Sequence, residues 1–305
     1  MDKRSVLITG CSDGGLGAAL ALELHAVGCR VIATARNPAK MEGLKSAGIE
    51  TLTLDVLSAS SIDASVREVR KLLSGRLDIL INNAGIAYYS PLAETDVDEA
   101  KRLFDLNVWA PVSVTQAYLP LLLQSKYGGI VVNNTSGSSV INTPYLSIYG
   151  ASKAALAMLT RGFHTEMAAF GIKAIDLKSG AVHSNIYSNS EVAHDYHVKE
   201  NSLFFAGKEW LEKFFSGEVL AAHNKPRDEW AKATVKAILQ PKTPIIIWGG
   251  AFTWSVWLGS YLPYSLQDWI SRDIARAHHV DKCIKDYRPQ KAIVDRYGPD
   301  AIVKP

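Results

Sequence analysis

Tyr149 and Lys153 form the pair of side chains best suited to chemistry in this sequence of 305 residues. They stand in Tyr149-Gly-Ala-Ser-Lys153, and a spacing of four puts both side chains on one face of a helix. An ammonium group beside a phenol stabilises the phenolate and lowers the pKa of the tyrosine towards the working pH. Such a tyrosine can donate a proton to a carbonyl oxygen while a hydride reaches the carbonyl carbon. The spacing alone is weak evidence, because about one such pair is expected by chance in a chain of this composition.

Ser136 precedes this pair and ends an apolar run that we interpret as a strand. From the end of a strand its hydroxyl can donate a hydrogen bond to an oxygen on which negative charge develops. Ser138 and Ser139 compete for the same role. In the alternative interpretation, the three serines form a polar turn and Tyr149 is an ordinary aromatic residue at a helix start.

A glycine-rich turn near the N-terminus is suited to phosphate. The run Thr9-Gly10-Cys11-Ser12-Asp13-Gly14-Gly15-Leu16-Gly17 leads from an apolar strand into a helix. Such a turn directs backbone N–H groups and a helix N-terminus at a phosphate, and glycine lets the backbone approach closely. The spacing of Gly10, Gly15 and Gly17 differs from G-x-G-x-x-G, so the position after the first strand carries the argument.

The end of the second strand favours NADPH over NADH. An NAD site usually has an acidic residue there, which binds the ribose 2′-hydroxyl. This strand ends in Thr34-Ala35-Arg36, and the Arg36 guanidinium is suited to a 2′-phosphate. Lys40 adds a second cation, whereas Asp13 in the glycine turn is mildly unfavourable beside phosphate. The alternative for Arg36 is a solvated arginine at a helix start.

Alternating strands and helices must position these residues. Most of the runs are almost continuously apolar, which is typical of parallel strands covered on both faces. The predicted strands are 5–10, 30–36, 49–56, 77–85, 128–136, 172–180 and 244–248. Amphipathic stretches at 16–27, 60–73 and 98–125 lie between them, and Pro111 and Pro120 should bend or break the third. The pattern predicts an α/β fold with a doubly wound, parallel, seven-stranded sheet, a Rossmann fold.

We divide the chain into a core over 1–186, a helical substrate lid over 187–226, the last core helix and strand over 227–248, and an apolar extension over 249–305. The lid segment follows the sixth strand, beyond whose carboxyl end ligands bind in such sheets. It is rich in aromatic residues: Tyr187, Tyr196, Phe204, Phe205, Trp210, Phe214 and Phe215. The alternative is an amphipathic helix pair that packs its aromatic rings into the core.

The segment 243–267 contains no charged side chain. Its length would suit a membrane-spanning helix, but Pro244, Pro263 and several glycines argue against one. The part over 251–269 carries tryptophans and tyrosines and is followed by Arg272 and Arg276, which suits a helix lying on a bilayer surface. A buried C-terminal helix or a contact between subunits are the alternatives.

Composition and residue spacing argue against a nucleic-acid-binding protein, a disulfide-bonded protein and a metal site. The net charge is +3 and the charges are spread evenly along the chain, so we expect no nucleic-acid partner. The three cysteines show neither a disulfide framework nor metal-ligand spacing, which favours a reducing, cytoplasmic location. We expect no metal, because His194-x-x-His197 and His278-His279 lack an acidic partner at H-E-x-x-H spacing.

Taken together, the motifs resemble those of the short-chain dehydrogenases/reductases, in that family's order over roughly residues 5–185. They are Thr9-Gly10…Gly15-x-Gly17, Asp55-Val56, Asn82-Asn83-Ala84-Gly85, Asn107-Val108, Ser136 and Tyr149…Lys153. The resemblance implies that Tyr149 is the acid/base, that Lys153 binds the nicotinamide ribose and tunes Tyr149, and that Ser136 orients the carbonyl. It also implies that Asn107 holds a water in a proton relay through Lys153.

The resemblance and the glycine turn together predict the cofactor site. Asp55 would contact adenine, Asn83 and Ala84 the adenosine ribose, and Val182 the carboxamide. Ser184 would replace the family's usual threonine, in a loop that has Ser179-Gly180 where Pro-Gly is usual. The complete set is Gly10, Ser12, Gly15, Leu16, Gly17, Arg36, Asp55, Val56, Asn83, Ala84, Tyr149, Lys153, Val182 and Ser184.

Within the family, the longer glycine turn, Ala33-Thr-Ala-Arg36 and the tail Trp248-Gly-Gly…Tyr261-Leu-Pro…Asp268-Trp269 resemble the fungal NADPH-dependent 1-acyldihydroxyacetone-phosphate reductase group. The resemblance implies an NADPH-dependent oxidoreductase that reduces a hydrophobic ketone, either an acylated dihydroxyacetone phosphate or a polyketide or terpenoid ketone. Lys199, Lys208 and Lys213 are candidate phosphate ligands or a solvated helix face. A location on endoplasmic reticulum or lipid particles and a dimer or tetramer formed through 98–125 and 149–168 are also implied. A non-catalytic NADPH-binding protein and a cofactor-bound isomerase or cyclase are the alternatives.

Overall fold

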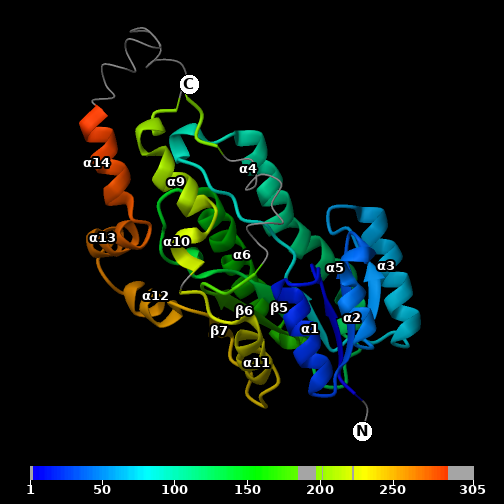
Figure 1. Cartoon of the computed structure of the whole chain (residues 1–305). Helices are drawn as coiled ribbons and strands as arrows, with labels where there is room; N and C mark the ends of the chain where they lie inside the picture. Colours follow the sequence, from blue (N-terminus) through cyan, green and yellow to red (C-terminus); the bar gives the residue numbers. More distant parts are fainter. Residues whose placement is uncertain (1–2, 185–196, 201, 222, 288–305) are drawn as a thin grey trace.

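Seven parallel strands form one sheet in the order β3-β2-β1-β4-β5-β6-β7 (Figure 1). The structure is a computed structural model and describes residues 3–184, 197–200, 202–221 and 223–287. The strands are β1 (Ser5–Ile8), β2 (Arg30–Ala35), β3 (Glu50–Thr53), β4 (Ile79–Asn82), β5 (Ile130–Asn134), β6 (Lys173–Ser179) and β7 (Ile246–Gly249). The predicted doubly wound sheet is therefore confirmed, and its order reverses between β1 and β4.

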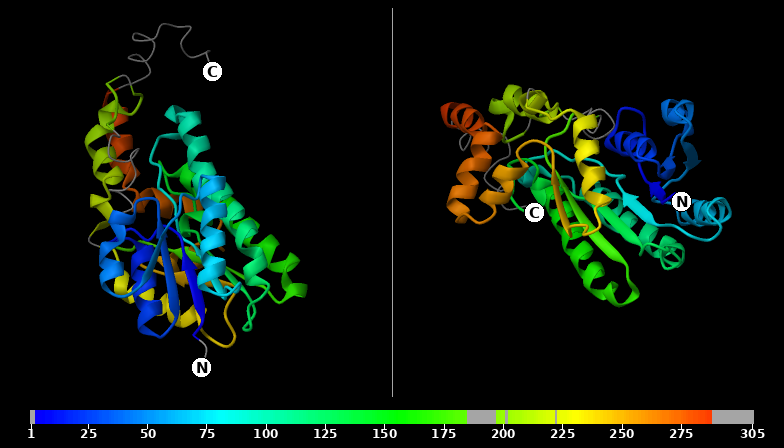
Figure 2. Two further views of the ribbon diagram at one scale, coloured as in Figure 1. Left: turned by 90° about the vertical axis from the view of Figure 1, so that its right-hand side faces the viewer. Right: turned by 90° about the horizontal axis from the view of Figure 1, so that it is seen from below.

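Helices cover both faces of the sheet because alternate strand residues point to opposite sides. In β1, Val6 and Ile8 pack in one buried cluster, whereas Leu7 belongs to the other. The first cluster includes residues of α1 (Leu16–Ala26) and α11 (Arg227–Ile238), and the second includes residues of α3 (Ala59–Leu72) and α5 (Ala110–Leu122). Figure 2 shows these helices on either side of the strands.

Short helices fill the connections. The first connections contain a 3-10 turn, η1 (Pro38–Met41), and α2 (Glu42–Ser46), and a further 3-10 turn, η2 (Leu92–Glu94), follows β4. The predicted helix over 98–125 is divided into α4 (Val97–Phe104), a π-helical turn, η3 (Asp105–Trp109), and α5. Pro111 lies in the first turn of α5, where its missing N–H is harmless, whereas Pro120 remains inside the helix. The predicted break is thus found beside Pro111.

The long helix α6 (Ser147–Glu166) presents Tyr149 and Lys153 in its first two turns. It follows β5 through a 3-10 turn, η4 (Gly137–Ser139), and leads to β6 through a further turn, η5 (Ala168–Phe170). Because α6 packs on β5 and β6 and contacts η4, one region of the fold carries Ser136, Tyr149 and Lys153.

A third buried cluster lies outside the sheet layers (Figure 1). It contains residues of α9 (Lys208–Phe215), α10 (Glu218–Ala221) and α14 (Ala277–Tyr287) together with Ala87 and Tyr89 from the segment after β4. A 3-10 turn, η6 (Phe205–Gly207), packs against α14 and α9. Phe214 and Phe215 are buried, and their rings contact that of Tyr89. These aromatic residues of 187–226 therefore pack into a small core. Tyr187 and Tyr196 lie outside the described residues, and the role of this segment as a lid stays a prediction.

The apolar stretch 251–269 forms two helices instead of one. α12 (Thr253–Gly259) and α13 (Tyr264–Ile274) are separated at Ser260–Pro263. Along the described chain we find no helix that is both long and apolar enough to cross a membrane. The face away from the sheet exposes large aromatic side chains, including 79% of Trp254 and 83% of Tyr264. The alternative of a buried C-terminal helix is therefore wrong for this face.

Candidate active site

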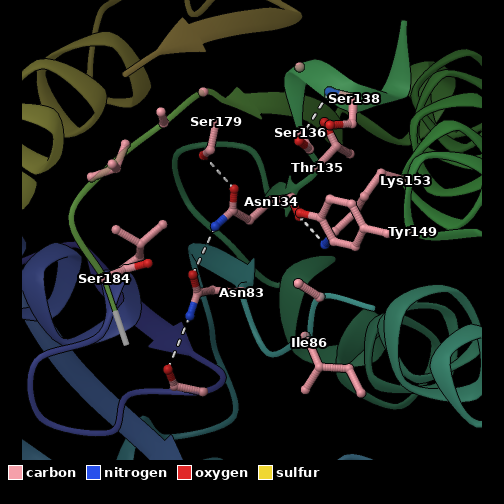
Figure 3. Close-up of a pocket in the computed structure, with 18 of the residues that line it drawn as sticks. Asn83, Ile86, Asn134, Thr135, Ser136, Ser138, Tyr149, Lys153, Ser179 and Ser184 are labelled. Carbon is pink, nitrogen blue, oxygen red and sulfur yellow. Dashed lines mark hydrogen bonds between the residues drawn. The ribbon is translucent and has the colours of Figure 1, made fainter. Parts of the chain in front are cut away.

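A pocket of about 420 Å³ lies beyond the carboxyl ends of the strands, around the switch point between β1 and β4 (Figure 3). Ligands of open α/β sheets bind in this crevice. Of the predicted site residues it is lined by Gly10, Ser12, Gly15, Leu16, Arg36, Asp55, Val56, Asn83, Ala84, Ser136, Tyr149, Lys153, Val182 and Ser184. Gly17 and Asn107 are not among its lining residues.

The glycine turn is shaped by two close approaches of backbone to backbone. Gly10 has φ +71°, and a Cβ there would lie 2.7 Å from the Cα of Ala84. A Cβ on Gly17 would lie 2.5 Å from both the carbonyl oxygen of Gly10 and Nδ2 of Asn83. Gly17 therefore allows the start of α1 to pack against Gly10 and Asn83, and it shapes the turn without lining the pocket.

Asp13, which we expected to disfavour phosphate, points its carboxylate elsewhere. Its Oδ2 accepts a hydrogen bond from the backbone N–H of Gly43 at 3.0 Å, and its own N–H donates to the carbonyl oxygen of Lys40 at 2.7 Å. The carboxylate thus ties the glycine turn to the start of α2. Arg36 and Lys40 are exposed and line the pocket at the end of β2.

A chain of side-chain hydrogen bonds fixes the ends of four strands (Figure 3). Ser179 Oγ donates to Asn134 Oδ1 at 2.7 Å, and Asn134 Nδ2 donates to Asn83 Oδ1 at 2.9 Å. Asn83 Nδ2 then donates to the carbonyl oxygens of Thr9 and Gly10. This chain makes the floor of the pocket rigid. Sequence reasoning missed Asn134 and Ser179; the signal was a polar residue at the end of each apolar strand.

Lys153 lies beneath Tyr149 at the start of α6. Its Nζ is 5.8 Å from the centroid of the Tyr149 ring and donates a hydrogen bond to the carbonyl oxygen of Asn134 at 2.9 Å. Burial disfavours the charged form and lowers the pKa of Lys153 to about 8, while the Asp176 carboxylate acts in the opposite direction. The tyrosine is half-buried and faces the pocket.

Ser136 occupies the turn between β5 and η4, on the same side of the pocket as Tyr149 (Figure 3). Its backbone is extended, and its Oγ accepts a hydrogen bond from the N–H of Ser138 at 3.1 Å. That bond leaves the hydroxyl proton of Ser136 available to donate. Ser138 also lines the pocket, whereas Ser139 is bound by Lys178 Nζ at 2.8 Å and does not.

Asn107 is fully buried in the π-helical turn between α4 and α5. Its amide donates to the carbonyl oxygen of Ile86 and to Ser152 Oγ, and its Oδ1 accepts from the N–H of Ile86. A Cβ on Gly85 would lie 3.0 Å from Asn107 Oδ1 and 3.4 Å from Lys153 Nζ. The side chain therefore fixes the backbone beside Lys153, and its role in a proton relay stays a prediction.

The wall of the pocket near Tyr149 comes from parts of the chain that are distant in sequence. It is formed by side chains that follow β4 or precede α6 and by the inner faces of α12 and α13. The apolar members are Ile86, Ala87, Tyr89, Ile141, Leu146, Phe252, Val256, Ile270 and Ile274. Of the described residues in the expected lid, Asn224 alone reaches the pocket. The C-terminal extension thus lines the pocket, which sequence reasoning did not anticipate.

The histidines of the C-terminal region are engaged in packing. His279 stacks on Trp210 with ring centroids 4.0 Å apart. No cluster of three or more potential metal ligands occurs in the parts of the chain that the structure describes. His194 lies outside those parts.

Residues 4–194 match the sequence profile of the short chain dehydrogenase family. The chain is 41% identical over 266 residues to the short-chain dehydrogenase/reductase GME11361 of Pestalotiopsis microspora, covering 87% of this chain and 91% of that protein. It is 33% identical to the NADPH-dependent 1-acyldihydroxyacetone phosphate reductase of Schizosaccharomyces pombe, over 86% and 90% of the two chains.

A solved short-chain dehydrogenase from Streptomyces avermitilis superposes with a TM-score of 0.73 at 29% identity, covering 92% of this chain and 98% of that one. A parallel sheet with a cofactor crevice and a tyrosine–lysine pair define an oxidoreductase that uses a nicotinamide cofactor. The chain belongs to the short-chain dehydrogenase/reductase family.

Proposed function

We propose that the protein is an NADPH-dependent carbonyl reductase that acts on a hydrophobic ketone. One observation carries this proposal: Tyr149, Lys153 and Ser136 line one end of a pocket whose other end has Arg36 and Lys40. The first three can protonate a carbonyl oxygen, and the two cations suit a 2′-phosphate.

The residues of the pocket fit a dinucleotide. Backbone at Gly10 approaches Ala84 so closely that no side chain can intervene, and the N-terminus of α1 faces the same crevice. Both features favour a pyrophosphate. When bound, NADPH supplies the hydride. Arg36 and Lys40 would hold the 2′-phosphate, Asp55 and Val56 the adenine, and Val182 and Ser184 the nicotinamide end.

The protein side of the reaction follows from three positions. Ser136 donates a hydrogen bond to the ketone oxygen and fixes its direction. Tyr149 donates its phenolic proton to that oxygen as negative charge develops on it. The ammonium of Lys153 stabilises the phenolate that remains, and this electrostatic effect is strong because the site is buried.

The lining of the pocket supports an uncharged substrate. The only cationic side chains among its described lining residues are Arg36, Lys40 and Lys153. Of the lysines considered as phosphate ligands, Lys213 pairs with Glu209 at 2.8 Å and Lys208 lies 3.8 Å from Glu212, both along α9. This favours a solvated helix face. We therefore place a polyketide or terpenoid ketone ahead of 1-acyldihydroxyacetone phosphate.

Sequence similarity to the relatives does not favour one of the two substrates. A further relative with 33% identity is the short-chain dehydrogenase ptmH of Penicillium ochrochloron, which matches the chain as closely as the Schizosaccharomyces pombe reductase does. The test is NADPH oxidation, followed by nicotinamide absorbance, with polycyclic ketones, a long-chain acyl-dihydroxyacetone phosphate and its unphosphorylated analogue. Tyr149→Phe is the control, and we expect it to lose turnover by about 10²-fold or more.

The outcomes discriminate between the alternatives. Turnover of polycyclic ketones that is lost in Tyr149→Phe supports the proposal. Turnover of the phosphorylated lipid alone moves the substrate to glycerolipids and leaves the mechanism intact. Tight NADPH binding without oxidation of NADPH by any ketone refutes the reductase and favours an isomerase, a cyclase or a non-catalytic binding protein.

We also propose that α12 and α13 rest on a lipid surface, which would make a cytoplasmic protein peripheral to the endoplasmic reticulum or lipid particles. The two helices and the turn between them expose Trp254, Leu258, Tyr261, Tyr264 and Trp269. Tryptophan and tyrosine are the side chains that favour the interface between lipid and water. Flotation with phosphatidylcholine vesicles tests this: Trp254→Ser/Trp269→Ser should abolish co-flotation, and an unchanged distribution would contradict it.

For assembly we propose a homodimer or tetramer formed through α5 and α6. These helices and the residues that flank them expose large apolar side chains that an interface between subunits would bury: Trp109, Leu123, Met158, Leu159 and Phe170. Light scattering coupled to gel filtration gives the mass directly. We expect Met158→Glu to yield monomers, and a wild-type mass of 33 kDa would refute the assembly.

A further inference from the structure

Two buried charges of opposite sign lie under the catalytic turn, in residues that neither the family motifs nor the pocket include. Asp176 and Lys178 occupy alternate positions of β6, so both point to the face covered by α6. Their side chains are 2% and 5% exposed, and Lys178 Nζ lies 2.7 Å from Asp176 Oδ2. A buried ion pair is costly to desolvate, so it calls for an explanation beyond stability.

The pair holds both ends of the segment that carries Ser136. Asp176 Oδ1 accepts a hydrogen bond from Thr135 Oγ1, directly before the serine. Lys178 Nζ donates to Ser139 Oγ at 2.8 Å, at the end of η4. The ring of Trp248, on β7, lies 5.7 Å from Lys178 Nζ and provides a cation–π contact.

Asp176 of this pair also acts on Lys153. Asn134, whose carbonyl oxygen accepts the hydrogen bond from Lys153, is the neighbour of Thr135. The negative charge of Asp176 favours the ammonium form of Lys153, against the effect of burial. The ionisable groups that we identify around this ammonium are Tyr149 from α6 and the Asp176–Lys178 pair from β6.

We infer that Asp176 and Lys178 are positioning residues of the catalytic centre: they fix the turn that carries Ser136 and set the charge environment of Lys153. The inference deepens the proposed reductase function and rests on it for the role of Ser136. Neither side chain lines the pocket, so both act through other residues.

The first test is the double variant Asp176→Leu/Lys178→Met. Replacing both charges by apolar groups avoids an unpaired buried charge, so we expect the fold to persist. The hydrogen bonds to Thr135 and Ser139 are lost, and Ser136 is held less precisely. We expect kcat to fall by about 10- to 100-fold while the Kd of NADPH changes by less than about 3-fold. An unchanged kcat would overturn the inference.

The second test separates tuning of Lys153 from a merely structural role and needs no turnover. NADPH binding, measured by cofactor fluorescence between pH 7 and 10, should weaken as Lys153 loses its proton. We call the pH at which half of this weakening has occurred the binding midpoint. We expect Asp176→Asn to move the midpoint to lower pH, because a negative charge near Lys153 is removed. We expect Lys178→Met to move it to higher pH, because a positive charge is removed. Midpoints that stay in place or move together would overturn the tuning role.

Two controls keep the outcomes interpretable. Lys153→Met should remove the midpoint altogether, which assigns the titration to that lysine. Lys101→Met breaks an exposed ion pair with Asp98, 2.9 Å long on α4, and should change neither kcat nor the midpoint. If the wild-type protein binds NADPH but none of the ketones leads to NADPH oxidation, the proposed function fails. The shifts of the binding midpoint would still decide whether Asp176 and Lys178 tune the charge of Lys153.

Discussion

Replacing Lys153 by methionine should inactivate the enzyme and at the same time stabilise the protein without cofactor. Burial lowers the pKa of Lys153 from 10.5 to about 8, so holding it protonated at neutral pH costs the fold about 3 kcal/mol. Against this, the variant loses the hydrogen bond from Nζ to the carbonyl oxygen of Asn134, worth about 1 kcal/mol. The net gain in the free energy of unfolding is about 2 kcal/mol at pH 7.

The lowered pKa of Lys153 also predicts how the difference in stability between wild type and variant changes with pH. Between pH 8 and 10.5 the folded protein has released the proton of Lys153 while the unfolded chain still binds it. The stability of the wild type therefore rises with pH relative to the variant, by linkage. The advantage of Lys153→Met should be present in full below pH 8, reach zero at about pH 9.5, and become a deficit of about 1 kcal/mol near pH 10.5, where only the lost hydrogen bond remains.

The assay is urea unfolding of wild type and variant at pH 7, 8, 9 and 10, without cofactor. Taking the difference between the two proteins cancels the titration of all other groups. Lys173→Met, which changes an exposed lysine at the start of β6, serves as the control. A difference that stays constant from pH 7 to 10 would refute the reasoning, and so would a variant less stable than wild type at pH 7.

Three further outcomes follow from single positions, one behind the pocket (Gly17) and two in its lining (Arg36 and Val256). Gly17→Ala should cost about 1–3 kcal/mol of stability and raise the KM for NADPH, because its Cβ would lie 2.5 Å from the Gly10 carbonyl oxygen; unchanged urea unfolding would contradict this. Arg36→Asp should lower the ratio of kcat/KM for NADPH to kcat/KM for NADH by about 10-fold or more. The reason is that a hydrogen bond to a charged group is worth about 1.5–3 kcal/mol. An unaltered ratio would mean that Arg36 does not bind the 2′-phosphate. Val256→Trp should reduce kcat/KM for polycyclic ketones by about 10-fold without affecting the Kd of NADPH, because Val256 belongs to the apolar wall. Equal turnover of large and small ketones by this variant would place the substrate elsewhere.

Much of the sheet and of the pocket lining could be predicted from the sequence because the relevant signals are local. Each buried strand is a short apolar run, and packing on both faces requires such runs wherever the sheet forms. The turn between β1 and α1 requires Gly10 at a positive φ, so this glycine is visible in the sequence itself. Tyr149 and Lys153 share a helical face by their spacing alone, and the structure places both on the pocket.

The positions that sequence reasoning missed depend on contacts between distant segments. Ser179 and Asn134 are 45 residues apart, and their hydrogen bond exists because β5 and β6 pair in a particular register. The ion pair of Asp176 and Lys178 is visible as two charges in an apolar strand, but its contacts with Thr135 and Ser139 are not. Register and helix packing bring these side chains together, and neither can be read from local composition.

The C-terminal extension shows the same division most clearly. The sequence by itself determined that the segment between Lys242 and Asp268 is apolar, aromatic and without charges. It also contains the proline at which the segment divides into α12 and α13. Only the tertiary structure decided that Val256 and Ile274 face the pocket while Trp254 and Trp269 face outward. The buried positions of these helices include the polar Thr253, Gln267 and Ser271. Large aromatic side chains such as Trp254 and Trp269 are exposed instead, so hydrophobic periodicity does not identify the inner face. The choice is made by packing against η4 and the segment before α6, which are more than 100 residues away in the chain.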